Sequence, residues 1–188
     1  MLRQLLEWDA ALAYWISSLH APWPIEWFMR AYSFSGTRGG LWLFIGGILT
    51  LRNRRLAGGF VRMALALLLS GWLVDGVIKP RVDRMRPFEA DSRIQVRGVR
   101  PTTRSFPSGH AASAMVGAYA LSLMMPQRRA LWWALGILMC FARVYLGAHY
   151  PLDVVGGALL GLACAVFVTG RARCYSQGLS GGMSPVPR

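Results

Sequence analysis

The chain has 188 residues, of which 54% are hydrophobic and only 15% are charged. Soluble domains average about 25% charged residues, so this composition indicates a protein that lies in lipid. The net charge of +13 calls for a negatively charged partner. Because the basic residues alternate with long apolar runs, anionic lipids or a phosphorylated ligand fit better than nucleic acid, which we exclude as a partner.

The N-terminal segment, residues 1–38, carries charges every few residues and is rich in tryptophan. This pattern predicts one or two helices that lie at the membrane surface, with a single spanning helix as the alternative. The tryptophans that we assign to interfacial belts are Trp8, Trp15, Trp23, Trp27, Trp132 and Trp133.

Apolar runs that approach the length of a transmembrane helix follow this segment. They cover residues 39–51, 56–78, 107–125, 130–149 and 150–170. We therefore predict an all-α integral membrane bundle of about five to six transmembrane helices, preceded by the interfacial helical segment. Residues 1–170 form one membrane-embedded domain in this prediction, and the polar residues 171–188 form a disordered tail.

Ionisable residues mark the ends of these runs, and they alternate between the end of one run and the start of the next. They are Asp75, Lys79, His110, Arg143, His149 and Asp153. Asp75 lies four residues before Lys79 on the same helix face, so we expect an ion pair that holds the lysine in place. Because consecutive helices cross a bilayer in opposite directions, all six fall on one membrane face. The basic loop of residues 79–106 joins them there. Ionisable residues at membrane depth indicate a functional site.

The residue types on this face fit the binding of a phosphate group. Lys79, Arg86 and Arg143 supply fixed cations, with Arg81, Arg84 and Arg104 in reserve, and Ser108 and Gly109 open a helix whose N-terminus favours anions. A histidine held by an acceptor can attack phosphorus, and Asp153 follows His149 by four residues. A second histidine could protonate the departing oxygen. This chemistry needs no metal, and no cofactor is predicted.

Three motifs then occur in order. "KPRVDRMRP" at 79–87 has the form K-x6-R-P, "PSGH" stands at 107–110, and "ARVYLGAHYPLD" at 142–153 contains R-x5-H-x3-D. Together they resemble the signature of the type 2 phosphatidic acid phosphatase family, which also includes the vanadium haloperoxidases. The family's third motif usually begins Ser-Arg, and Ala142 replaces that serine here.

The resemblance implies a role for each matching residue. His149 is the expected nucleophile, which becomes phosphohistidine, Asp153 orients it, and His110 acts first as general acid and then as base. The expected phosphate-binding residues are Lys79, Arg86, Ser108, Gly109 and Arg143. The short chain is similar to compact bacterial undecaprenyl pyrophosphate phosphatases, which implies a lipid phosphate or diphosphate as substrate in the bacterial inner membrane.

Several alternatives remain open at this point. Phosphatidylglycerophosphate or phosphatidic acid could be the substrate, a vanadate-dependent haloperoxidase could use the same residues, and a lipid-phosphate binding or transport component would need no catalysis. The basic loops at 52–55 and 126–129 predict a cytoplasmic location for their face, so the site would face the periplasm or cell exterior. The oligomeric state is not predicted.

Overall fold

The structure is a computed structural model that describes residues 1–180. Residues 181–188, and the side chains of Leu2 and of residues 171–180, lie outside the described part of the chain. The predicted disordered tail, residues 171–188, therefore stays a prediction for residues 181–188, whereas the backbone of residues 171–180 is helical.

Every regular element among residues 1–180 is helical, which confirms the all-α prediction for this part of the chain. The α-helices are α1 (Leu2–Ser18), α2 (Trp23–Ser35), α3 (Gly40–Arg52), α4 (Ala57–Trp72), α5 (Lys79–Val82), α6 (Pro87–Ala90), α7 (Gly109–Met124), α8 (Arg129–Tyr145) and α9 (Pro151–Ser180). A π-helical stretch, Leu73–Ile78, continues α4 and leads directly into α5.

The predicted apolar runs correspond to α3, α4 with its π-helical extension, α7, α8 and α9. The main difference concerns His149, which we placed at the end of the fourth run. Helix α8 ends at Tyr145, so His149 lies in the turn that connects α8 to α9. Pro151 begins α9, where its fixed φ and missing N–H are tolerated.

Two segments are long and apolar enough to cross a membrane by length and composition, Arg54–Ala90 and Pro151–Gly170. Helices α7 and α8, with 16 and 17 residues, are shorter. At 1.5 Å per residue each rises only about 24–26 Å, slightly less than a typical hydrocarbon core.

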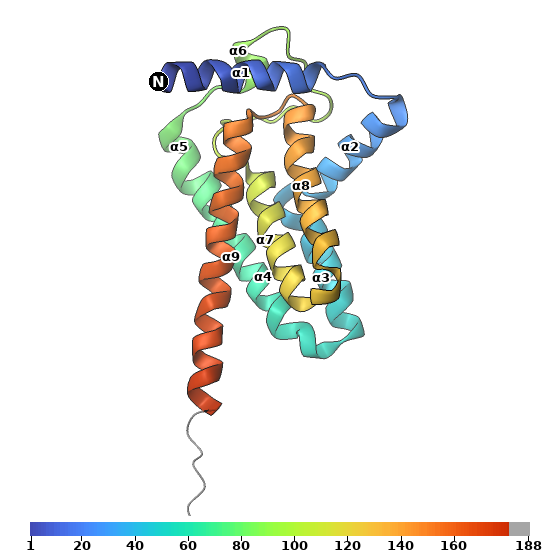
Figure 1. The fold of residues 1–188 in the computed structure, drawn as a ribbon, viewed down its shortest axis with the longest axis vertical. Coiled ribbons are helices and arrows are strands. Elements are labelled where there is room, and N and C mark those ends of the chain that lie inside the picture. Colours follow the sequence, from blue (N-terminus) through green and yellow to red (C-terminus); the bar gives the residue numbers. More distant parts are fainter. Residues whose placement is uncertain (181–188) are drawn as a thin grey trace, which may run out of the picture.

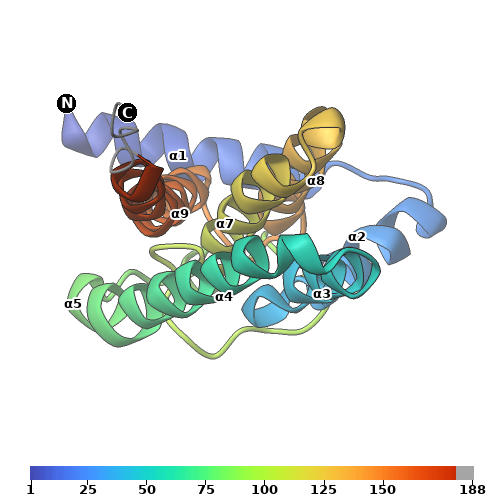
Figure 2. The same cartoon turned by 90° about the horizontal axis from the view of Figure 1, so that it is seen from below.

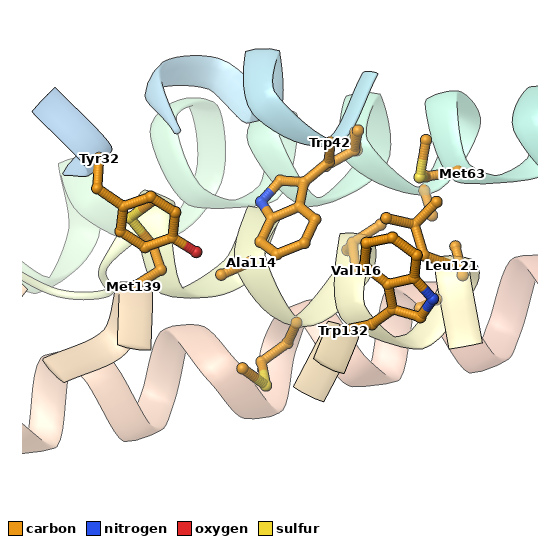
Figure 3. Close-up of a cluster of buried hydrophobic side chains, with 13 residues drawn as sticks. Tyr32, Trp42, Met63, Ala114, Val116, Leu121, Trp132 and Met139 are labelled. Atoms are coloured by element: carbon orange, nitrogen blue, oxygen red, sulfur yellow. The ribbon is translucent and has the colours of Figure 1, made fainter. Parts of the chain in front are cut away.

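Helix α7 is the centre of the bundle and packs against α4, α8 and α9 (Figures 1 and 2). It can be buried nearly all round because small residues dominate its sequence, "GHAASAMVGAYALSLM". The ring of Trp42, fully buried, fills the space beside Gly117, where a Cβ atom would lie 2.1 Å from it (Figure 3). Large aromatic side chains on the outer helices thus complement small residues on the central one.

Two glycines let α9 approach α7 closely. A Cβ at Gly157 would lie 2.2 Å from the carbonyl oxygen of Ser108, and one at Gly161 would lie 2.1 Å from that of Ala112. The Gly157-x3-Gly161 pattern therefore serves helix packing inside the bundle. This contact also fixes the start of α7 against the start of α9, where the predicted site residues lie.

The N-terminal segment forms two helices, α1 and α2, where one or two were predicted. In Figure 1, α1 lies across the end of the bundle, roughly perpendicular to α9. Trp8, Trp15, Trp23 and Trp27 are all more than half exposed, as interfacial residues would be. The assignment of Trp132 to an interfacial belt was wrong: it is only 6% exposed and packs in the core with Trp42 (Figure 3).

Candidate active site

The predicted site residues meet at one cavity of about 1000 Å³ near the end of the bundle covered by α1. Those that line it are Lys79, Arg86, Gly109, His110, Arg143 and His149. They come from α5, the following loop, the start of α7, the end of α8 and the turn before α9. Residues 70 positions apart in the sequence are therefore close enough to contact one small ligand.

Ser108 and Asp153 do not line the cavity; both are fully buried next to residues that do. The Ser108 hydroxyl accepts a hydrogen bond from the amide of Ala111 at 3.4 Å, which makes Ser108 the N-cap of α7. The amide of Ser108 donates to the carbonyl of Asp153 at 2.9 Å. Capping therefore places Gly109 and His110 in the first turn of α7, at the end of the helix that attracts anions.

The turn that carries His149 is shaped by Gly147. Its φ of +72° lies in the left-handed region, and a Cβ there would lie 2.8 Å from the carbonyl oxygen of Gln95. The amide of Arg97 donates to the carbonyl of Leu146 at 3.1 Å, so the long basic loop packs directly on this turn. Glycine at 147 thus lets the loop and the turn come together beside the cavity.

The environment of the His149 ring distinguishes its two nitrogens. Nε2 lies 3.2 Å from a guanidinium nitrogen of Arg86, which can only donate, so Nε2 is the unprotonated nitrogen. The proton is therefore on Nδ1, which lies 3.6 Å from a carboxylate oxygen of Asp153. Burial, opposed by Asp153 and reinforced by the positive charges of Arg143 and Arg86, lowers the pKa of His149. The ring is thus neutral at physiological pH, with the lone pair on Nε2.

Asp153 is held by donors on both of its oxygens. Oδ2 accepts from the Ser105 hydroxyl at 2.5 Å and from the Tyr150 amide at 3.0 Å. Oδ1 accepts from Arg84 at 2.6 Å. The 3.6 Å separation between Oδ2 and Nδ1 of His149 exceeds the usual hydrogen-bond range, so a small displacement separates this pair from a direct hydrogen bond.

Arg86 has a structural role in addition to the predicted role in phosphate binding. It donates to the carbonyls of Thr103, Ala148 and Arg104 as well as to the Thr103 hydroxyl. With the contact to His149, these bonds engage all of its N–H groups. Arg86 thereby ties the basic loop to the His149 turn, and its role in phosphate binding stays a prediction.

Arg143 and Lys79 are also buried cations at the cavity. Arg143 is 7% exposed and donates to the Ser33 hydroxyl at 2.5 Å, while its Nε has no hydrogen-bond partner among the described residues. Lys79 donates to Asp75 at 2.8 Å, which confirms the predicted i,i+4 pair, and to the Thr103 hydroxyl at 3.1 Å. A buried donor without a partner is costly, and an anion in the cavity would satisfy it.

Sequence reasoning missed several side chains that support the site. Ser33, Thr103 and Ser105 contact Arg143, Arg86 and Asp153 respectively. Arg84, which we held in reserve for phosphate, instead forms ion pairs with Asp9 and Asp153, and Arg104 pairs with Asp83. Arg84 lies in the loop after α5 and its partner Asp9 is 75 residues away, so no local sequence signal identifies this pair.

Comparison with known proteins identifies the family of the chain. The PAP2 superfamily profile matches residues 59–173, which is more than half of the chain and includes all three motifs.

The chain belongs to the PAP2 superfamily.

Solved structures extend this PAP2 match to most of the chain. The crystal structure of Aquifex aeolicus LpxE is similar with a TM-score of 0.73 and 28% identity, over 85% of this chain and 93% of that one. The structure of a transmembrane PAP2-type phosphatidylglycerolphosphate phosphatase from Bacillus subtilis is similar with a TM-score of 0.71 and 26% identity, over 90% of this chain and 87% of that one. These matches place the chain among integral membrane proteins, and the enzyme class they indicate is that of phosphoric ester hydrolases.

One curated relative is more similar but over a shorter range. An undecaprenyl-diphosphatase from Sulfolobus acidocaldarius is 42% identical over 83 residues, which is 42% of this chain and 38% of that protein. The chain thus aligns with less than half the length of this relative.

Proposed function

We propose that this PAP2 protein is an integral membrane phosphatase that removes the terminal phosphate from a lipid phosphate or diphosphate, with undecaprenyl pyrophosphate as the leading substrate. The observation that carries the proposal is the neutral Nε2 of His149, which lies beside Arg86 in a cavity that Lys79, His110 and Arg143 also line. A nucleophile and three cations at one cavity are the requirements of phosphoryl transfer.

The reaction proceeds in two steps. Nε2 of His149 attacks phosphorus, the bond from phosphorus to the leaving oxygen breaks, and His110 gives that oxygen its proton. Asp153 stabilises the positive charge that develops on the imidazole ring. A water molecule then gives a proton to His110 and attacks the phosphohistidine, the phosphorus–nitrogen bond breaks, and inorganic phosphate leaves. Arg143, Lys79 and Arg86 stabilise the charge on the other phosphate oxygens.

The shape of the cavity supports a lipid substrate. Beyond the cationic end, much of its lining is apolar and comes from α2, α3, α4 and the adjoining π-helical segment, with Phe34, Leu43, Leu67, Trp72 and Val74 among these residues and Arg30 and Arg38 beside them. A hydrocarbon chain can lie along these walls while its phosphate reaches His149. The similarity to a named undecaprenyl-diphosphatase favours the diphosphate, and that to a phosphatidylglycerolphosphate phosphatase makes phosphatidylglycerophosphate the second candidate.

A phosphate-release panel tests this proposal. Purified protein in detergent is given undecaprenyl pyrophosphate, phosphatidylglycerophosphate or phosphatidic acid at equal concentrations, and inorganic phosphate is measured. We expect the highest kcat/KM for undecaprenyl pyrophosphate. Binding of these lipids without release of phosphate from any of them would instead indicate a binding or transport component, and halide oxidation with added vanadate would indicate a haloperoxidase.

We also propose a topology in which α3, α4 with its extension, α7, α8 and α9 cross the inner membrane, α1 lies at its outer surface, and the site faces the periplasm. The α3–α4 and α7–α8 connections lie at the opposite end of the bundle (Figure 1). These connections and the helix ends beside them carry Arg52, Arg54, Arg55, Arg128 and Arg129. All eight acidic residues of the chain lie in the N-terminal segment or near the site end, so the opposite end has uncompensated positive charge.

Cysteine labelling in intact cells tests this orientation. In a background without the native cysteines, Ser92→Cys places a thiol on the exposed surface of the basic loop, and Asn53→Cys places one at the opposite end. We expect a membrane-impermeant maleimide to label position 92 but label position 53 only after lysis. The reverse pattern would contradict the proposed topology.

A further inference from the structure

Asp9 is a buried carboxylate on a helix whose outer face is exposed. Along α1, the side chains of Leu5, Trp8, Leu12 and Trp15 are exposed, whereas Asp9 is only 5% exposed. Both of its oxygens accept hydrogen bonds from other parts of the chain. Oδ2 accepts from Arg84 at 2.6 Å, and Oδ1 accepts from the amide of Leu152 at 2.9 Å.

The guanidinium group of Arg84 joins Asp9 to the site. Its second terminal nitrogen donates to Oδ1 of Asp153 at 2.6 Å, and its Cζ lies 4.0 Å from the centre of the Tyr150 ring. One cation therefore bridges two buried carboxylates and is held flat by an aromatic ring. Because the guanidinium is planar, this arrangement fixes both its position and its orientation.

The contact between Asp9 and Leu152 also lies beside Asp153, at the start of α9. Leu152 is the second residue of α9, so Asp9 accepts from one of the amides that a helix N-terminus leaves without an intrahelical partner. A negative charge there is also favoured by the helix dipole. Asp9 thus contacts the backbone next to Asp153 directly and contacts the Asp153 side chain through Arg84.

Asp153 in turn is the carboxylate that faces Nδ1 of His149, at 3.6 Å. If Arg84 moved, Oδ1 of Asp153 would lose its only side-chain donor among the described residues, and the carboxylate plane could rotate about the bonds that Ser105 and Tyr150 make to Oδ2. Misplacement of a catalytic group by about 1 Å can cost about 10²-fold in rate.

We propose that Asp9 and Arg84 are positioning residues, which hold Asp153 in the orientation that His149 requires, and that α1 is therefore part of the catalytic unit. This inference rests on the proposed function. Asp9 lies outside residues 59–173, the range that the PAP2 profile matches, so family membership alone does not assign it a role. The pair acts through Asp153 and does not touch the substrate.

The test compares kcat and KM for phosphate release in purified Asp9→Asn, Arg84→Lys and Arg84→Gln variants and in the double variant Asp9→Asn/Arg84→Gln. The matched control is Glu7→Gln, which makes the same change from acid to amide at an exposed position of α1, where Arg3 is the one ion-pair partner of Glu7 among the described residues. Rates are normalised to the folded, monodisperse fraction from size-exclusion chromatography, and thermal unfolding is recorded for each variant.

We expect Asp9→Asn to lower kcat about 10-fold and Arg84→Gln to lower it about 100-fold, with KM changed less than about 3-fold in both. Arg84→Lys should recover part of the loss, because an ammonium group can reach one carboxylate but cannot bridge both with fixed geometry. The double variant should be no slower than Arg84→Gln alone, since both changes break one chain of contacts. Glu7→Gln should match the wild type.

Two results would overturn the inference. One is a wild-type kcat per folded molecule in Asp9→Asn and Arg84→Lys. The other is failure of both conservative variants to fold, which would assign the pair to stability alone. Failure of the proposed function is distinguishable, because it would appear as absence of phosphate release in the wild-type protein and in Glu7→Gln.

Discussion

The variant His149→Gln is expected to release phosphate at least about 10⁴-fold more slowly than the wild type. Glutamine keeps a polar side chain of similar length but offers no nitrogen lone pair that can attack phosphorus, so no covalent intermediate can form. Losses of this size are typical when the nucleophile of a covalent mechanism is removed. The measurement is inorganic phosphate release by purified protein with saturating lipid substrate.

The matched control is His20→Gln, which makes the same substitution at an exposed histidine outside the cavity. It should retain wild-type turnover, while both variants should elute as folded protein in detergent. If folded His149→Gln kept more than a tenth of the wild-type rate, His149 would not be the nucleophile.

The variant His110→Asn is expected to lose activity in proportion to the basicity of the leaving group. With an alkyl lipid phosphate, whose leaving oxygen would be an alkoxide, kcat/KM should fall about 10³-fold, because a general acid contributes about 10²–10⁴-fold. With p-nitrophenyl phosphate, whose leaving group needs no proton, the fall in kcat/KM should be less than about 10-fold. The fall in kcat/KM for a lipid diphosphate should lie between the falls for these two substrates.

This dependence separates proton donation from a mere contribution to binding. A histidine that only binds phosphate would slow all three substrates by the same factor. Equal losses across the series would therefore contradict the role of His110 as general acid and leave that role to another group at the cavity.

Much of the site could be predicted because its residues carry local signals. Lys79 and Asp75 are four residues apart on a helix, and their ion pair formed as expected. His149 and Asp153 have the same spacing, although a turn and Pro151 intervene, so the expected proximity holds at 3.6 Å and not at hydrogen-bond distance. The ends of the apolar runs placed the ionisable residues on one face because lipid forces the chain to cross in alternating directions.

The features that escaped prediction depend on contacts between distant segments. Arg84 and Asp9 are 75 residues apart, and nothing in the local pattern of α1 indicates which of its acids is buried. Trp132 was assigned to the membrane interface because tryptophan is common there, yet it packs in the core. Arg86 was expected only to bind phosphate, because its bonds to three backbone carbonyls arise from the path of the basic loop.

The most direct test of the account is to locate the phosphoryl group during turnover. Wild-type protein is mixed with lipid substrate labelled in its terminal phosphate, quenched in alkali within the first turnover, digested and analysed by mass spectrometry. We predict a transient phosphoryl group on the imidazole of His149, absent from His149→Gln and longer-lived in His110→Asn given p-nitrophenyl phosphate. Turnover with no phosphorylated residue, or with the phosphoryl group on another side chain, would contradict it.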